Sequence, residues 1–206
     1  MKESEKHIYP VFDKILQRKD KEKLLRQRSK VIWMTGLSGA GKTTIAKYLD
    51  EALYRQGYIA QILDGDNIRA GINNNLSFSD DDRFENIRRI AEISKLFINC
   101  GIIIINSFIS PTEAIRKMAL EIIGKENFVE VFVSAPIEVC EQRDTKGLYA
   151  RARRGEIRNF TGIDSPFELP EHADVTIHTH KQTIEESVNQ LLDYLIPLIR
   201  YDEPEA

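Results

Sequence analysis

Short apolar runs alternate with amphipathic segments along most of the chain, from Val31 onward. Five apolar runs predict strands, and they cover residues 31–35, 58–64, 102–110, 128–135 and 174–179. Runs of this length with little polar alternation are typical of strands that are buried on both faces, as in a parallel sheet.

Helical periodicity fills the intervals between these runs. Apolar residues recur on one face of four segments, residues 43–57, 80–101, 112–123 and 183–199. A short helix opens at Pro136, and Gly57 and Gly101 are suited to end the first two helices. This alternation predicts an α/β fold of three layers, in which helices cover both faces of a mostly parallel sheet.

Two polar segments interrupt the alternation. Residues 1–29 carry many Lys and Arg and few apolar residues. We expect an N-terminal arm there, with short helical pieces, ahead of a domain that spans residues 30–206. Residues 144–172 form a polar stretch that is unusually long for a loop inside a compact domain. Such stretches often bind or cover ligands, so we expect this one to be a lid.

Composition and charge narrow the range of partners. The 206 residues are 42% hydrophobic and 30% charged with a net charge of −3, which disfavours a nucleic-acid or anionic-membrane partner. The apolar run at 102–105 is too short to span a bilayer, and residues 2–6 offer no apolar signal-peptide core. Cys100 and Cys140 lack zinc or disulfide spacing, so we expect two buried thiols and a cytoplasmic protein.

The first chemical motif is glycine-rich and joins the first expected strand to its helix. Gly36, four residues, Gly41, Lys42 and Thr43 have the spacing of a phosphate-binding loop, or P-loop. Lys42 would reach the β- and γ-phosphates of ATP, and the Thr43 hydroxyl would ligate Mg²⁺. A turn that needs glycine only for steric reasons is the alternative, which the complete pattern disfavours. The expected ATP-binding residues are Gly36, Leu37, Ser38, Gly39, Ala40, Gly41, Lys42, Thr43 and Thr44.

Two carboxylates are the next candidates. The strand at 102–105 runs into Asn106, where many P-loop proteins have an acid. Asp64 and Asp66 instead follow the preceding strand, and Gly65 permits a sharp turn between them. We expect both acids beside the P-loop at the carboxyl edge of the sheet. A turn without function is the alternative for Asp64.

Cations gather near these acids. Arg69 follows the Asp64–Asp66 turn, and Arg83 and Asn86 share one helical face. The lid contributes Lys146, Arg151, Arg153, Arg154 and Arg158. Because the whole chain carries a net negative charge, this local cluster of Arg and Lys predicts an anionic acceptor that binds beside ATP. A solvated surface is the better interpretation for Arg88 and Arg89, and it also suits Arg151.

Aromatic and imidazole side chains allow two interpretations each. Phe78 and Phe160 lie in polar loops, where they could either plug the loop or stack on a flat base. His178 and His180 share a strand face but have no metal-ligand spacing, so surface histidines are favoured.

The chain resembles the adenylylsulfate kinase family in six ordered segments: GLSGAGKTTIA, DGDNIRAGIN, FSDDDRFENIRRIAEI, FISP, FVSAPIEVCEQRDTKGLYARARRGEI and FTGIDSPFELP. The likeness runs from about residue 30 to the C-terminal helix, and the combination is specific. It implies a P-loop kinase that uses ATP and Mg²⁺ to phosphorylate the 3′-hydroxyl of adenosine 5′-phosphosulfate (adenylylsulfate). The products would be 3′-phosphoadenylylsulfate and ADP.

The resemblance also implies roles for single residues. Lys42, Asp66 and Ser110 would be catalytic, Asp66 would join Thr43 at the metal, and two phenylalanines would stack on the acceptor adenine. The implied acceptor site comprises Asp64, Asp66, Arg69, Phe78, Arg83, Asn86, Ile109, Ser110, Lys146 and Phe160. Family members are usually dimeric, so we expect a homodimer in which the arm takes part. An ATP sulfurylase is a candidate functional partner.

Departures from the family pattern bear on selectivity. The chain reads SGAGKTT where the family usually reads SGSGKST, and NLSF where it usually reads DLGF. After the ISP motif the family usually has Tyr-Arg, whereas this chain has Thr112 and Glu113. A carboxylate at Glu113 near an anionic substrate would weaken acceptor binding or shift selectivity. Two alternatives stay open: a related kinase for another small anionic acceptor, and a nucleotide-sensing module without turnover. A complete set of Lys42, Thr43 and both acids argues against the sensor.

Overall fold

A sheet of five parallel strands forms the centre of the molecule, seen in a computed structural model that describes residues 7 and 9–202. The strands are β1 (Val31–Thr35), β2 (Ala60–Asp64), β3 (Ile103–Ser107), β4 (Phe128–Ser134) and β5 (Val175–His178). Their order across the sheet is β2-β3-β1-β4-β5, and every neighbouring pair is parallel. The predicted α/β class and parallel sheet are confirmed.

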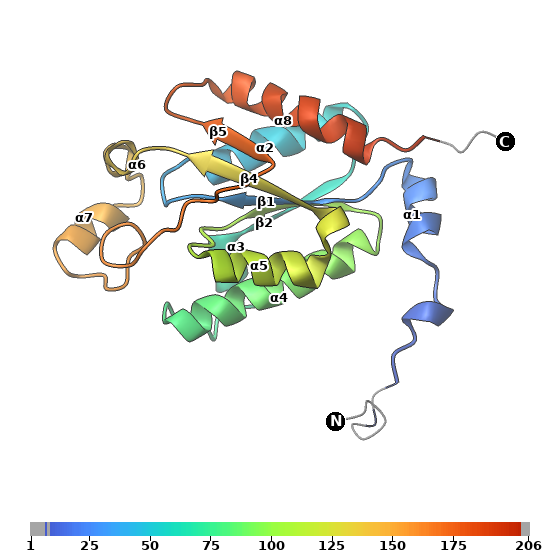
Figure 1. Cartoon of the computed structure of the whole chain (residues 1–206), viewed down its shortest axis with the longest axis horizontal. Coiled ribbons are helices and arrows are strands. Elements are labelled where there is room, and N and C mark those ends of the chain that lie inside the picture. The colour runs from blue at the N-terminus through green and yellow to red at the C-terminus, as the bar shows by residue number, and fades with distance from the viewer. Residues whose placement is uncertain (1–6, 8, 203–206) are drawn as a thin grey trace.

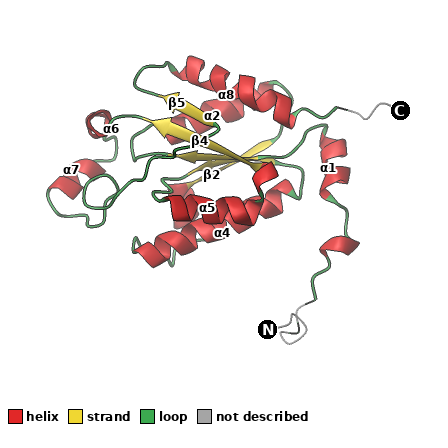
Figure 2. Ribbon diagram, viewed as in Figure 1, coloured by secondary structure: helices red, strands yellow, loops and turns green. Residues whose placement is uncertain are grey.

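Two pairs of helices cover the faces of this sheet. Helices α2 (Lys42–Arg55) and α8 (Ile184–Ile199) pack on one face, and α4 (Asp80–Ile98) and α5 (Glu113–Ile123) pack on the other (Figures 1 and 2). Successive strand residues serve opposite faces: Ile105 packs in the cluster beneath α2 and α8, whereas Ile104 packs against α4 and α5. The chain therefore has two apolar cores in three layers.

Several short elements were not predicted from the sequence. Helix α3 (Gly65–Ala70) replaces the expected turn after β2, because the Asp64 side chain accepts a hydrogen bond from the Asp66 backbone N–H and caps the helix. The predicted lid begins after α6 (Ile137–Arg143) and contains α7 (Leu148–Arg153). A 3₁₀ turn, η3 (Lys125–Asn127), precedes β4.

The N-terminal arm lies at the end of the sheet opposite to α7 (Figure 1). It contains η2 (Phe12–Lys14) and α1 (Arg18–Leu25), which agrees with the expected short helical pieces. Expectations for residues 1–6 and 8 lie outside the described residues. The end of the arm is part of the domain core, since the side-chain amide of buried Gln27 donates to the carbonyl oxygens of Gly101 (2.8 Å) and Ile59 (2.9 Å).

The prediction of two buried thiols is half wrong. Cys140 is buried, but Cys100 is exposed. The reason is that α4 ends at Ile98, so Cys100 lies in the turn before β3 and not on the buried helix face. Among the described residues, we find no helix with the length and apolar character that crossing a membrane requires.

Candidate active site

A single cavity of about 990 Å³ lies where the P-loop, α3, the start of α4 and the lid meet. This volume is at the upper end of the range for ligand sites. It collects most of the residues predicted from the sequence: Ser38, Gly39, Gly41, Lys42, Thr43, Thr44, Asp64, Asp66, Arg69, Phe78, Arg83, Asn86, Ile109, Ser110, Lys146 and Phe160. The other three predicted residues, Gly36, Leu37 and Ala40, belong to the P-loop but do not line the cavity.

The P-loop geometry depends on its glycines. Gly36 lies so close to β4 that a Cβ there would come within 2.4 Å of the Val133 carbonyl oxygen, and Gly41, the residue just before α2, has a φ of +104°. Lys42 is only 8% exposed, and its ammonium donates to the carbonyl oxygens of Gly36 and Leu37, both at 2.8 Å. Burial disfavours the charged ammonium and lowers the pKa of Lys42 to about 8.

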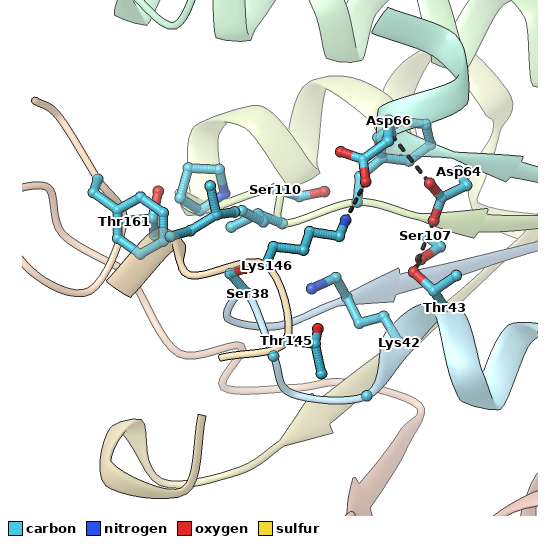
Figure 3. Close-up of a pocket in the computed structure, with 18 of the residues that line it drawn as sticks. Ser38, Lys42, Thr43, Asp64, Asp66, Ser107, Ser110, Thr145, Lys146 and Thr161 are labelled. Atoms are coloured by element: carbon cyan, nitrogen blue, oxygen red, sulfur yellow. Dashed lines mark hydrogen bonds and ion pairs between the residues drawn. The ribbon is translucent and has the colours of Figure 1, made fainter. Parts of the chain in front are cut away.

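The hydroxyl of Thr43 has a carboxylate beside it (Figure 3). Thr43 Oγ1 donates to Asp64 Oδ2 at 2.8 Å and lies 3.3 Å from Ser107 Oγ. We expected the two acids beside the P-loop, but β3 separates β2 from β1. Asp64 reaches the loop nevertheless, because it pairs in register with Ser107 at the end of β3. These oxygen atoms are the kind of donors that Mg²⁺ prefers.

Asp66 has a different partner. Its carboxylate forms an ion pair with Lys146 of the lid, and both side chains are more than half exposed. Figure 3 shows this contact on the opposite side of Asp66 from the hydrogen bond that joins its backbone to Asp64. The structure thus puts Asp64, and not Asp66, next to the Thr43 hydroxyl. No group of three or more His, Cys, Asp or Glu side chains within residues 7 and 9–202 could hold a metal ion by itself.

Arg69 and Arg83 contact the loops that carry Phe78 and Phe160. The Arg69 guanidinium carbon lies 4.4 Å from the centre of the Phe78 ring, in a cation–π contact, and Arg69 also donates to the Ser77 carbonyl oxygen. Arg83 donates to the Phe78 carbonyl oxygen (3.0 Å), and across the cavity to the Thr161 hydroxyl (2.8 Å) and the Asn159 carbonyl oxygen. Arg83 therefore ties the start of α4 to the lid.

The two phenylalanines differ in their surroundings. Phe78 is 61% exposed, so apart from its contact with Arg69 its ring is open to solvent. Phe160 is partly buried and packs edge-on against Tyr149, with the ring centres 4.9 Å apart. The Phe160 ring packs in the lid, as the plug interpretation expects, and it also lines the cavity. Stacking of this ring on a base stays a prediction. Asn86 is buried and accepts a hydrogen bond from Asn73.

Ser110 is held in an unusual conformation. Its φ of +45° is rare for a residue with a side chain. Its hydroxyl accepts a hydrogen bond from the Trp33 indole N–H (3.0 Å), and its carbonyl oxygen accepts from Arg116 (3.1 Å). The Thr35 hydroxyl donates to the neighbouring Ile109 carbonyl oxygen at 2.6 Å. Buried side chains from β1 and α5 thus fix the turn after β3 at the cavity wall.

The unusual residues Thr112 and Glu113 do not line the cavity. Thr112 caps α5, and the Glu113 backbone N–H donates to the Glu168 carboxylate at 2.6 Å. Glu168 in turn donates its backbone N–H to the Pro111 carbonyl oxygen at 2.8 Å. This pair of bonds anchors the C-terminal part of the predicted lid to the turn after β3. The proposed charge effect of Glu113 on the acceptor has no contact to support it.

Several cavity residues were missed from the sequence. Arg143 donates to the carbonyl and hydroxyl oxygens of Thr179 (2.8 and 3.0 Å), and the Thr179 hydroxyl donates to the P-loop carbonyl oxygen of Ala40 (2.7 Å). With Gln182 they line the end of the cavity away from Phe78. Thr179 follows β5 at the carboxyl edge, so strand topology could have indicated it. Tyr149 carried no such signal, because α7 was not predicted.

Most of the residues interpreted as surface groups lie apart from the cavity, but Arg151 does not. Arg88 and Arg89 both pair with Glu85 on α4 and do not line the cavity, whereas Arg151 does. His178 is exposed at the end of β5, an edge strand of the sheet. Its ring meets that of His180 edge-on, 6.0 Å away.

Comparisons with known proteins show which family the chain is similar to. The family model for adenylylsulphate kinase matches residues 28–178. The adenylyl-sulfate kinase of Bacteroides thetaiotaomicron is 61% identical over 197 residues, which are 96% of this chain and 98% of that protein. The adenylyl-sulfate kinase of Clostridium acetobutylicum is 52% identical over 87% of this chain and 90% of its own length.

A solved structure gives the same result at the level of the fold. The APS kinase of Mycobacterium tuberculosis, solved in complex with AMPPNP and APS, superposes with a TM-score of 0.79. The two chains are 42% identical, over 82% of this chain and 98% of the other. The family match covers well over half of the sequence, and the relatives are similar along nearly their whole length. The chain belongs to the adenylylsulfate kinase family of P-loop kinases.

Proposed function

We propose that the cavity binds ATP and adenylylsulfate together and that the chain transfers the γ-phosphoryl group of ATP to the 3′-hydroxyl of adenylylsulfate. The products are ADP and 3′-phosphoadenylylsulfate. One observation carries this proposal: a single cavity joins the P-loop to a separate end lined by Arg69, Phe78, Arg83 and Phe160. A related structure that contains both AMPPNP and APS supports the same arrangement.

The donor would occupy the P-loop and the Arg143 end of the cavity. The phosphates would lie against the backbone N–H groups at the start of α2, where the helix dipole is positive. Lys42 would exchange the carbonyl oxygens of Gly36 and Leu37 for phosphate oxygens. The planar guanidinium of Arg143, fixed by Thr179, offers a face for the base of ATP.

The oxygen atoms at Thr43 and Asp64 fit a magnesium ion. A hydroxyl and a carboxylate that lie 2.8 Å apart match the preference of Mg²⁺ for a few protein oxygens together with water and phosphate. We infer that Thr43 would hold the ion directly and that Asp64 and Ser107 would orient its bound water. When bound, the ion supplies positive charge that offsets the charge on the β- and γ-phosphates.

The acceptor would occupy the other end of the cavity. Its adenine would stack between Phe78 and Phe160, and Arg69 would supply guanidinium N–H groups to the phosphosulfate. Asp66 and Lys146 both line the cavity and are paired with each other. We infer that they part when substrate enters, so that Asp66 orients the 3′-hydroxyl and Lys146 contacts the phosphates. Phosphoryl transfer depends chiefly on such positioning and on charge neutralisation.

The lid would exclude water during transfer. Residues 144–165 carry α7 and the Phe160 turn, and residues 166–169 are anchored by Glu168. A lid hinged near this anchor could close over both nucleotides while the turn after β3 keeps its position. Ser110 in that turn would contact the acceptor through its hydroxyl.

A coupled assay of ADP release tests the proposed function. Adenylylsulfate, adenylate and two other nucleoside monophosphates would be offered as acceptors at equal concentration with Mg²⁺-ATP. We expect adenylylsulfate to be preferred by at least about 100-fold in kcat/KM, because only it carries the sulfate charge for the cavity cations. Equal rates with adenylate would favour a kinase for another acceptor, and tight binding without ADP release would favour a sensor.

We also propose a homodimer in which the arm takes part. Tyr9, Phe12, Leu16 and Leu24 are each more than 60% exposed along the described part of the arm, and such apolar side chains are suited to a second copy of the chain. Sedimentation of the full chain and of a chain lacking residues 1–16 tests this proposal. A dimer that persists without those residues would contradict it. A cytoplasmic location and partnership with an ATP sulfurylase stay predictions.

A further inference from the structure

Tyr149 lies between the P-loop residue Ser38 and Phe160 at the proposed acceptor end of the cavity, and no motif in the sequence indicated a role for it. It belongs to α7 in the lid and is 2% exposed. Its hydroxyl donates to the carbonyl oxygen of Ser38 in the P-loop at 2.9 Å. Burial raises the pKa of this phenol, so the hydroxyl keeps its proton at neutral pH and stays a donor.

The ring of Tyr149 contacts the proposed acceptor site. The rings of Tyr149 and Phe160 form a T-shaped pair, with their centres 4.9 Å apart and their planes at 76°. Edge-to-face pairs of this kind fix the relative orientation of two rings. The position of Phe160 therefore depends on Tyr149, and the position of Tyr149 depends on the Ser38 carbonyl.

A second contact brings the P-loop and the Phe160 turn together. Gly162 has a φ of +91°, and a Cβ at this position would lie 3.0 Å from Leu37 Cδ2. Leu37 is the P-loop residue before Ser38. The loop and the turn thus approach too closely for one to shift freely past the other.

We propose that Tyr149 couples the two nucleotide sites, so that ATP on the P-loop strengthens the binding of adenylylsulfate against Phe160. The proposal rests on the proposed function. Phosphate binding fixes the peptide groups of the P-loop, including the Ser38 carbonyl, which holds Tyr149 and through it the Phe160 ring. Tyr149 is a positioning residue in this account, since it acts through Phe160. The coupling must be reciprocal, because the free energy that links two binding sites is the same in both directions.

Binding calorimetry measures this coupling directly. The affinity of AMPPNP with Mg²⁺ and the affinity of adenylylsulfate are each measured alone and with the other ligand saturating. For either ligand, the coupling factor is its affinity with the other ligand bound divided by its affinity alone. We expect a factor of about five or more in the unmodified chain. Tyr149→Phe removes only the hydroxyl and keeps the ring against Phe160. We expect it to lower the factor by about threefold or more, the effect of one hydrogen bond.

Two further variants make the result specific. Tyr194→Phe also removes one tyrosine hydroxyl, which contacts Asp174 just before β5, at the opposite end of that strand from the cavity residue Thr179, and should leave the coupling factor unchanged. Phe160→Leu keeps the bond from Tyr149 to Ser38 but removes the ring contact, so the factor should fall here too. Because the readout is a ratio, a general weakening of binding or a lower melting temperature does not move it.

The outcomes separate this inference from the proposed function. A factor that Tyr149→Phe leaves unchanged, or a factor of one in the unmodified chain, would overturn the coupling alone. An unmodified chain that does not bind adenylylsulfate would overturn the proposed function and the coupling with it.

Discussion

The buried ammonium of Lys42 predicts that ATP binding takes up protons. Burial lowers its pKa from 10.5 to about 8 in the ligand-free chain. Between these two pH values the folded chain binds fewer protons than the unfolded chain. Lys42 therefore costs stability below pH 8, and the cost disappears as the pH rises toward 10.5. At about 1.4 kcal/mol per pH unit, the cost at neutral pH is roughly 3 kcal/mol.

Phosphate oxygens at the P-loop reverse this shift, because they surround the ammonium with negative charge. We expect the pKa of Lys42 to return to its usual range when Mg²⁺-ATP binds. Lys42 is half protonated at pH 8 without ligand, so binding should take up about 0.5 proton at pH 8 and about 0.1 at pH 7. The terminal phosphate of ATP contributes little at pH 8, since its own pKa lies near 6.

Calorimetry in two buffers of different ionisation enthalpy measures the uptake. The apparent binding enthalpy differs between the buffers by the number of protons taken up times the difference in ionisation enthalpy. Lys47→Met is the matched control, because Lys47 lies on the same helix but its side chain is 68% exposed. It should keep the uptake, whereas Lys42→Met should abolish it. Uptake that is the same at pH 7 and pH 8, or that persists in Lys42→Met, would refute the account.

Three other perturbations test the site. Phe78→Ala should weaken adenylylsulfate binding by about 1–3 kcal/mol and leave ATP affinity and melting temperature nearly unchanged, because the exposed Phe78 ring supports little of the core. An equal loss of affinity for both nucleotides would speak against stacking. Asp64→Asn should raise the Mg²⁺ concentration needed for half-maximal rate more than Asp66→Asn does, since only Asp64 lies beside Thr43. A larger rise in Asp66→Asn would assign the metal role to Asp66 instead. Amide exchange in residues 144–165 should slow when both nucleotides bind, while residues 166–169 change little; uniform exchange across 144–169 would contradict the anchored lid.

Much of the fold was determined by the sequence itself, for a local reason. Strand and helix periodicities and the glycine spacing at Gly36 and Gly41 are properties of adjacent residues, so they predict the parallel sheet and the P-loop directly. Ordered motifs identified the family, because such combinations seldom occur by chance. Element boundaries depend on caps that the periodicity does not show: the Asp64 side chain caps α3 where a turn was expected, and α4 ends before Cys100 and leaves it exposed.

Only the tertiary structure decided which partner each side chain has. Whether Asp64 or Asp66 meets Thr43 depends on the order of strands and on the cap of α3, and both acids look alike in the sequence. The same holds for Glu113. Its position after the FISP motif suggested a role in the cavity, but Glu113 is the first residue of α5 and does not line the cavity. Tyr149 and Ser38 are 111 residues apart along the chain. Contacts over such separations depend on how the layers pack, and no local pattern of residues carries that information.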